Sequence, residues 1–279
     1  MAVKVFFNPA SPQEAVRLMY EQPGRGAYLA GGTDLLCSPE WPDFVVNIRG
    51  LLATLAQEAG ELVIGAAATI SRIAAWQALS EADDGLMQSC ARGFASEQIR
   101  NMATVGGNLA SAVPSADFAT PLLALEAQCV IQAPEGQRTI PLEGFFAGPH
   151  QSVLDRELLL KIRLPLPSAG VRTEFLKIGR NPGDIATINV ATLLELECDK
   201  IQKARIALGA VAPTPIRAYA AEEFLAGKPA SDENIQRAAD LAREAVQPIS
   251  DQRASADYRR QMSMVLTRRA LQRCLGRNQ

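Results

Sequence analysis

The pattern of apolar and polar positions in the first part of the chain predicts a small α/β unit. Segment Ser11–Glu14 has the form of a helix-capping box with proline at the first helical position, and the helix that it opens is expected to end near Pro23-Gly24. Short apolar runs bounded by turn residues predict three strands, over residues 27–30, 44–48 and 62–64.

A second α/β unit is expected after the third strand. Thr69 can cap a helix over residues 70–79, and further helical patterns cover residues 85–93 and 121–127, with the polar segment 96–101 between them. Two strand patterns, 129–131 and 138–140, flank a Pro134-Glu135-Gly136 turn as a hairpin, and residues 158–164 alternate as a strand.

The segment 164–170 is rich in residues that stop regular structure, and it marks the expected domain boundary. Beyond it, residues 201–208 form a strand pattern, and apolar residues recur with a period of two at Ile188, Val190, Leu194 and Leu196. Helices fill much of the remainder. We therefore expect an N-terminal domain over residues 1–168, with subdomains of about 1–54 and 55–168, and a C-terminal domain over residues 172–279.

Composition excludes several classes of partner. The formal net charge of -2 provides no broad basic field for a nucleic-acid backbone or an anionic membrane surface. No apolar run approaches the roughly 20 residues that a membrane-spanning helix needs, and the apolar start is too short for a secretory signal. A cytoplasmic location is therefore expected.

The five cysteines are odd in number and far apart, at Cys37, Cys90, Cys129, Cys198 and Cys274. None forms the close pair that zinc and iron-sulfur sites usually require, so we expect no metal in this chain. We interpret the cysteines as small buried hydrophobic residues. Any iron-sulfur cluster would belong to a partner.

Two glycine pairs carry the candidate chemistry. A dinucleotide diphosphate bears two negative charges, and a protein can bind it without lysine or arginine by turning several backbone amides inward at a glycine loop or helix start. Gly31-Gly32 follows a predicted strand and precedes Thr33 and Asp34, which suits such a nest. For a single glycine pair, an ordinary tight turn between strand and loop is the favoured explanation.

The second pair, Gly106-Gly107, lies in a polar cluster within an otherwise apolar region. It is framed by Thr104 and Asn108, and Ser111, Ser115 and Asp117 follow downstream. Such a loop offers donors to phosphate and one carboxylate acceptor for sugar hydroxyls. A capped helix start with Asp117 exposed to solvent is the alternative that the residues leave open.

Other nucleotide and catalytic motifs have little support. Gly24-Arg25-Gly26 lacks the third glycine of the Rossmann fingerprint and precedes a strand, and Gly227-Lys228-Pro229 lacks the spacing and hydroxyl of a P-loop. The single histidine, His150, has no Gly-x-Ser-x-Gly elbow to accompany it, so a histidine-based hydrolytic triad is not indicated.

Both glycine pairs lie in longer motifs, Leu29-Ala30-Gly31-Gly32-Thr33-Asp34-Leu35-Leu36 and Thr104-Val105-Gly106-Gly107-Asn108-Leu109. Further characteristic stretches follow along nearly the whole chain, at residues 98–101, 115–117, 145–148, 184–186 and 211–217. Together these motifs resemble the FAD subunits of molybdenum hydroxylases, a family that includes bacterial xanthine dehydrogenases and aerobic carbon monoxide dehydrogenases.

The resemblance implies an α+β fold. It consists of an FAD-binding domain of the vanillyl alcohol oxidase type with two α/β subdomains, followed by a smaller C-terminal domain of the carbon monoxide dehydrogenase flavoprotein type, with an antiparallel sheet and helices. FAD is the only cofactor implied for this chain, because the sequence has no cysteine-rich insertion for an extra iron-sulfur cluster. Cys37, near the first glycine pair, could attach a flavin covalently, but an apolar structural role is favoured.

The resemblance also implies roles for individual residues. The cofactor diphosphate would bind to the backbone amides of Leu29–Leu36 and Thr104–Asn108, and Ser111 belongs to the same site. Asp117 would bind cofactor hydroxyl groups, Phe94 would lie near the flavin ring, and Leu159 and Lys177 would line the pocket. From the residues alone, Phe94 also fits a core aromatic, Lys177 an exposed lysine and Leu159 a solvent-facing strand residue. The loop 180–184 is implied to lie near the flavin face.

The implied function is that of an oxidoreductase subunit for electron transfer. Electrons would pass from a molybdenum cofactor-binding large subunit through the two-iron two-sulfur clusters of a small subunit to this FAD, and then to NAD or another acceptor. Three different subunits, duplicated into a dimer of heterotrimers, are expected. The alternatives are a self-sufficient flavin oxidase of the same fold, for which no acid-base residue is evident, and a flavin-free scaffold.

Overall fold

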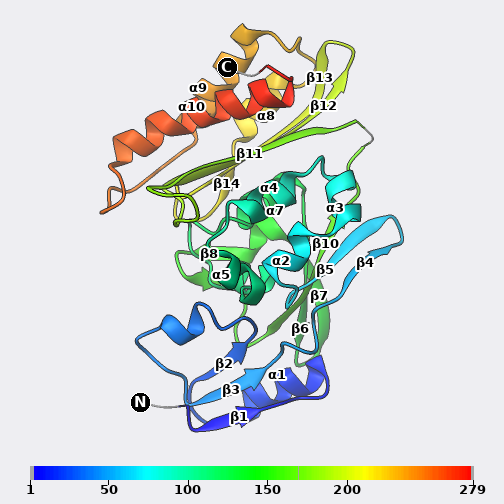
Figure 1. Ribbon diagram of the computed structural model, residues 1–279, viewed down its shortest axis with the longest axis vertical. Helices are drawn as coiled ribbons and strands as arrows, with labels where there is room; N and C mark the ends of the chain where they lie inside the picture. Colours follow the sequence, from blue (N-terminus) through cyan, green and yellow to red (C-terminus); the bar gives the residue numbers. More distant parts are fainter. Residues whose placement is uncertain (1–2, 169, 278–279) are drawn as a thin grey trace.

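The computed structural model describes residues 3–168 and 170–277 (Figure 1). A three-stranded sheet lies at one end of the molecule, a five-stranded sheet with short helices occupies the middle, and a four-stranded sheet covered by helices lies at the other end. We call residues 3–165 the N-terminal part and residues 170–277 the C-terminal part. This mixed arrangement agrees with the predicted α+β fold class.

The first sheet is parallel, with strand order β1-β3-β2. Its strands are β1 (Val5–Phe7), β2 (Gly26–Leu29) and β3 (Phe44–Asn47), and helix α1 (Pro12–Glu21) packs beside it. The predicted helix cap is confirmed, because the Ser11 hydroxyl accepts a hydrogen bond of 3.1 Å from the Glu14 amide. A short 3-10 turn, η1 (Leu35–Cys37), follows β2.

The middle sheet is antiparallel, with strand order β4-β5-β10-β6-β7. The strands are β4 (Leu55–Glu58), β5 (Glu61–Gly65), β6 (Gln128–Ala133), β7 (Gly136–Pro141) and β10 (Leu158–Pro165). The helices are α2 (Ile70–Ala74), α3 (Gln77–Ala82), α4 (Leu86–Arg92), α5 (Glu97–Met102), α6 (Val105–Ala110) and α7 (Ala119–Ala124). Three short elements link β7 to β10: η2 (Leu142–Phe145), β8 (Phe146–Gly148) and β9 (Gln151–Ser152).

The single helix predicted over residues 70–79 is wrong, since two helices, α2 and α3, occupy this region. The chain leaves helical geometry at Trp76, where ψ is 101°. The Trp76 carbonyl accepts a hydrogen bond of 3.0 Å from the side-chain amide of the buried Gln88, on α4. This contact depends on a residue 12 positions away, which local periodicity does not reveal.

The C-terminal sheet is antiparallel, with strand order β11-β12-β13-β14. Its strands are β11 (Arg172–Ile178), β12 (Ile188–Glu197), β13 (Lys200–Gly209) and β14 (Ile216–Arg217). Helices α8 (Tyr219–Leu225), α9 (Asp232–Glu244) and α10 (Ala256–Cys274) cover one face, and the N-terminal part covers the other (Figure 1). Strand β12 is therefore buried on both faces: Ile188 and Val190 pack with the helices, whereas Ala191 and Leu193 join the core of the N-terminal part.

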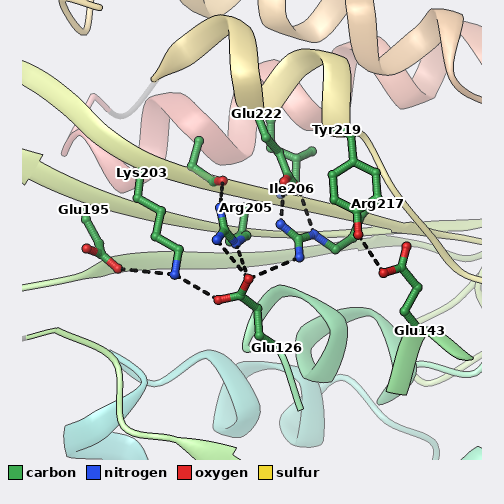
Figure 2. A network of polar contacts seen from close by, with 10 residues as sticks. Glu126, Glu143, Glu195, Lys203, Arg205, Ile206, Arg217, Tyr219 and Glu222 are labelled. Carbon is green, nitrogen blue, oxygen red and sulfur yellow. Dashed lines mark hydrogen bonds and ion pairs between the residues drawn. The ribbon is translucent and has the colours of Figure 1, made fainter. Parts of the chain in front are cut away.

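Ion pairs around Glu126 join the two parts at the end of α7 (Figure 2). The Glu126 carboxylate accepts hydrogen bonds from Lys203 Nζ at 2.8 Å and Arg205 Nε at 2.9 Å, both on β13, and Arg217 lies 3.4 Å away. Tyr219 adds a hydrogen bond of 2.6 Å to Glu143. Although partial burial raises the pKa of Glu126, Lys203 and Arg205 lower it to about 2.

The interpretation of all five cysteines as buried is wrong for two of them. Cys90, Cys129 and Cys274 are buried thiols, but Cys37 and Cys198 are exposed. Cys37 therefore does not have the apolar structural role that was favoured for it. Within residues 3–168 and 170–277, no group of histidine, cysteine and acidic residues is arranged to hold a metal ion, and no helix is long and apolar enough to span a membrane.

Glu126→Gln should lower the melting temperature by about 2–4 °C at neutral pH, which corresponds to about 1 kcal/mol for a partly solvent-screened ion-pair network. The folded-state pKa of Glu126 lies below its usual 4.5, so its contribution is present above that pH and is lost as the pH falls towards about 2. The difference in melting temperature between variant and wild type should shrink over that range. Glu135→Gln, at the exposed β6–β7 turn, is the matched control; an equal effect of both substitutions would contradict the assignment.

Candidate functional site

The first glycine loop presents unpaired backbone amides. Gly32 has a φ of +75°, in the left-handed region that favours glycine, and its carbonyl accepts a hydrogen bond of 3.0 Å from the Leu36 amide. Among the described residues, the amides of Ala30–Asp34 donate no hydrogen bond to another protein group. A run of amides without protein acceptors is the arrangement that an anion nest requires.

The first glycine loop packs against the residues that immediately precede the second motif. A Cβ atom on Gly31 would lie 2.1 Å from the carbonyl oxygen of Met102 and 3.0 Å from the Cα of Ala103, just before the second motif. Gly106 is equally confined, because a Cβ there would lie 2.6 Å from the carbonyl oxygen of Ala66. Glycine is therefore required at Gly31 and Gly106 for backbone packing.

The second motif starts a capped helix, which was the structural alternative for this segment. Thr104 caps α6, and its hydroxyl accepts a hydrogen bond of 3.1 Å from the Gly107 amide. The amides of Val105, Gly106 and Asn108 also donate to protein carbonyls, so within the described residues this motif offers no run of unpaired amides like that of the first loop; of Thr104–Asn108, the Thr104 amide alone donates no hydrogen bond. Gly107 is exposed, and a Cβ there would meet only the Thr104 hydroxyl oxygen, at 3.0 Å.

Asp117 is buried, so its predicted alternative as an exposed carboxylate is wrong. Only 6% of the residue is exposed. Its Oδ2 accepts a hydrogen bond of 2.7 Å from Lys177 Nζ, and its Oδ1 accepts one of 3.0 Å from the side-chain amide of Asn189. Burial raises the pKa of Asp117, and the charge and hydrogen bonds of Lys177 and Asn189 oppose that shift.

Phe94 and Lys177 belong to the same cluster. The Phe94 ring packs edge-to-face on Phe118 with centroids 5.7 Å apart, and Lys177 Nζ also donates to the Gly93 carbonyl at 2.7 Å. Lys177 is therefore an ion-pair partner with only 10% of its side chain exposed, and its interpretation as an ordinary exposed lysine is wrong. The Asn108 side chain links the second glycine motif to this cluster, because its Oδ1 accepts a hydrogen bond of 3.1 Å from the Phe118 amide.

The loop 180–184 also reaches this cluster. Gly183, with a φ of +87°, forms a backbone bridge with Phe94, and a Cβ on Gly183 would lie 2.9 Å from the Ala95 carbonyl oxygen. Asp184 closes the loop by accepting a hydrogen bond of 3.1 Å from the Asn181 amide. The loop is thus held against the segment that carries Phe94.

Two predicted site residues have other surroundings. Leu159 is 3% exposed and belongs to the core of the N-terminal part, which excludes the solvent-facing alternative. The Ser111 hydroxyl donates a hydrogen bond of 2.9 Å to the Asn108 carbonyl at the end of α6. Ser111 thus lies at the end of the helix that carries the second glycine motif, and that helix contacts β10, the strand of Leu159.

The sequence interpretation missed Asn189, a fully buried amide on β12. Its signal was a single polar residue between Ile188 and Val190, in a strand with apolar residues on both faces. A groove of about 520 Å³ lies beside Glu126, between η2 and β13, away from the glycine loops. Its cations Lys203, Arg205 and Arg217 are paired with carboxylates, so the groove is a weaker anion site than the first loop.

Family comparisons agree with this geometry. The model described as "FAD binding domain in molybdopterin dehydrogenase" matches residues 2–167, and "CO dehydrogenase flavoprotein C-terminal domain" matches residues 174–274. Both the unpaired amides of the first loop and the buried Asp117 suit a dinucleotide with a diphosphate and hydroxyl groups. The prediction of FAD as cofactor is confirmed.

Full-length relatives are similar in sequence and structure. The carbon monoxide dehydrogenase medium chain of Hydrogenophaga pseudoflava is 32% identical over 95% of each chain, and the xanthine dehydrogenase FAD-binding subunit of Escherichia coli O157:H7 is 31% identical over 95% of this chain and 94% of its own. Among solved structures, carbon monoxide dehydrogenase from Hydrogenophaga pseudoflava superposes with a TM-score of 0.94 at 33% identity, covering 100% of this chain and 99% of the other. Quinoline 2-oxidoreductase from Pseudomonas putida 86 has a TM-score of 0.92 at 29% identity, covering 99% and 98%.

These matches confirm the predicted family, fold class and oxidoreductase activity. The chain belongs to the family of FAD-binding flavoprotein subunits of molybdopterin dehydrogenases, which includes the medium chain of carbon monoxide dehydrogenase and the FAD-binding subunit of xanthine dehydrogenase.

Proposed function

We propose that this chain transfers electrons within a heterotrimeric molybdenum hydroxylase, from the two-iron two-sulfur clusters of a small subunit to NAD or another acceptor. The observation that carries this proposal is its alignment with 95% of a carbon monoxide dehydrogenase medium chain, a component of a larger enzyme by its name. A large subunit with the molybdenum cofactor would oxidise the substrate. A dimer of heterotrimers and a cytoplasmic location belong to the same proposal.

The described residues support a specific placement of FAD. The free amides of Ala30–Asp34 would hold the diphosphate, and the open face of Gly107 would let the cofactor approach α6. Thr104 would support the site by capping the start of α6. Leu35 and Leu36, which lie in η1, would hold the first loop in place, since the Leu36 amide donates to the Gly32 carbonyl. When bound, FAD supplies the electron-accepting and electron-donating chemistry.

The other predicted residues surround the proposed flavin end of the site. Asp117 keeps unused lone pairs with which it would accept hydrogen bonds from cofactor hydroxyls, and Lys177 would keep it ionised. Phe94 would provide an apolar wall near the flavin ring, and Ser111, Asn108 and Leu159 would support that wall from α6 and β10.

A division into domains at residues 1–168 and 172–279, with subdomains of about 1–54 and 55–168, belongs to this proposal. It is supported by two separate hydrophobic clusters: one lies mainly in the N-terminal part, with a few residues of the C-terminal sheet such as Ala191, and the other lies within the C-terminal part. The segment between β10 and β11, with Pro167 and Gly170, agrees with a boundary there. Cofactor contacts from Lys177 would make the second domain part of the FAD site.

Purification of the native complex tests the proposed function. The chain should copurify with a molybdenum-containing large chain and an iron-sulfur chain, and addition of the complex's substrate should bleach the flavin absorbance. A self-sufficient oxidase would instead reduce its flavin with substrate after the chain has been purified alone. That result, with no companion chains in the native preparation, would overturn the proposal.

Gly107→Val should remove bound FAD while leaving the fold intact. The new side chain would have room within the protein, apart from the Thr104 hydroxyl at 3.0 Å from its Cβ, but would fill the face by which the cofactor approaches. We expect an FAD affinity at least about tenfold weaker, measured by the flavin-to-protein ratio and by titration of the flavin-free protein.

Gly144→Val is the matched control, because nothing lies within 4 Å of a Cβ at that exposed position. It should retain wild-type flavin content. Full flavin occupancy in a folded Gly107→Val protein would exclude the proposed approach of FAD to α6. Circular dichroism would establish that both variants are folded.

The loop 180–184 is proposed to control access of the electron acceptor to the flavin. Asp184→Ala removes the carboxylate that closes the loop onto Asn181, so the loop should loosen beside Phe94. In the assembled complex, the rate of flavin reoxidation should change by about threefold or more for at least one acceptor, whereas the rate of flavin reduction by substrate should not. Stopped-flow measurement of both half-reactions checks this, and unchanged reoxidation with every acceptor would refute it.

A further inference from the structure

Asn189 is part of a row of three residues that crosses the C-terminal sheet. It is the register partner of Lys177 on β11 and of Gly209 on β13. Asn189 is fully buried, on the side of β12 that faces the N-terminal part. A buried amide needs partners for both its donor and its acceptor, so its neighbours show what the position is built to do.

Both ends of the Asn189 amide are engaged. The nitrogen donates a hydrogen bond of 3.0 Å to Asp117 Oδ1, and the oxygen accepts one of 2.6 Å from the Thr120 hydroxyl on α7. Reversal of the amide would set its oxygen against the Asp117 carboxylate. The Thr120 hydroxyl therefore fixes the orientation in which Asn189 donates to Asp117.

Gly209 provides the space for this amide. A Cβ atom at Gly209 would lie 2.3 Å from Asn189 Oδ1 and 2.9 Å from the Thr120 hydroxyl oxygen. Its φ is not in the left-handed region, so backbone conformation does not require glycine there. Glycine is required at position 209 because the backbone there packs closely on the Asn189–Thr120 pair.

The two carboxylate oxygens of Asp117 thus accept hydrogen bonds from a charged donor, Lys177, and a neutral donor, Asn189, which are register partners on neighbouring strands. Lys177 neutralises the charge at Oδ2, while Asn189 holds Oδ1 without adding a charge. We propose that Asn189 is a positioning residue for FAD, which fixes the Asp117 carboxylate in the orientation that the cofactor hydroxyls need. This inference rests on the proposed placement of FAD beside Asp117.

Asn189→Asp tests this role, because it keeps the shape of the side chain and replaces the donor by a second carboxylate. At neutral pH, FAD affinity should fall about 10- to 100-fold, the loss expected when a hydrogen bond to a charged group is replaced by repulsion. Lowering the pH should restore much of that affinity, since a shared proton would again link the two carboxyls. The other titratable groups facing this point in the described structure are Lys177 and the buried Cys90 thiol.

The measurement is titration of the deflavinated native complex with FAD across a range of pH. Thr192→Val is the matched control: it lies on the same strand and is equally buried, but its hydroxyl contacts Cys274 on α10 rather than Asp117. The control should bind FAD within about twofold of wild type. An equal, pH-independent loss in both variants would reduce Asn189 to a general packing role and overturn the proposal.

A folded Asn189→Asp variant with wild-type FAD affinity at every pH would also overturn it. If that variant does not fold, Thr120→Val provides the test, because it removes the hydroxyl that orients the amide; about threefold weaker binding is expected, and unchanged binding would refute the role. Gly107→Val distinguishes a failure of the role of Asn189 from a failure of the proposed FAD placement. If Gly107→Val empties the site while the Asn189 and Thr120 variants bind normally, only the role of Asn189 fails; if Gly107→Val also binds normally, the FAD placement itself fails.

Discussion

The buried carboxylate of Asp117 constrains how the two parts of the chain are joined. Burial of an ionised group costs several kcal/mol unless a charge and hydrogen bonds compensate for it, and here the compensation comes from Lys177 and Asn189 across the domain junction. Without the C-terminal sheet in this position, Asp117 would be left unpaired in the core. The N-terminal part can therefore keep the Asp117 carboxylate buried and ionised only when the C-terminal sheet lies in this position.

The four motif glycines have three different physical roles. Gly31 and Gly106 allow two backbone segments to pack against neighbouring carbonyls, and Gly32 adopts a left-handed conformation. Gly107 alone has an open face. The local sequence presents two similar pairs, so it predicted their shared importance but not this division, which depends on segments as distant as Ala66 and Met102.

Elements with strong periodicity or local signals were predictable, as α1, β10 and the β6–β7 hairpin show. The short strands β1 and β4 were not predicted, because Val5 and Phe6 are exposed and β4 carries only two partly buried apolar residues, so neither has a clear pattern. In the site, the glycine loops were identified from local motifs and the family resemblance. The partners of Asp117 could not be identified from local motifs, because they lie 60 and 72 residues further along the chain. One of them, Lys177, was named only because the family resemblance implied it.

The segment from Asp117 to Glu126 makes the C-terminal part a component of the site rather than an appendage. Asp117, before α7, forms the buried junction with β11 and β12, and Glu126, after α7, forms the partly exposed ion pairs with β13. Helix α7 is therefore attached to the same sheet at both of its ends. Exposed ion pairs are weak because water and salt screen them, whereas the buried junction fails if either donor is lost. The buried junction at Asp117 therefore constrains the register of the contact more strongly than the screened ion pairs at Glu126, which add a smaller stabilisation.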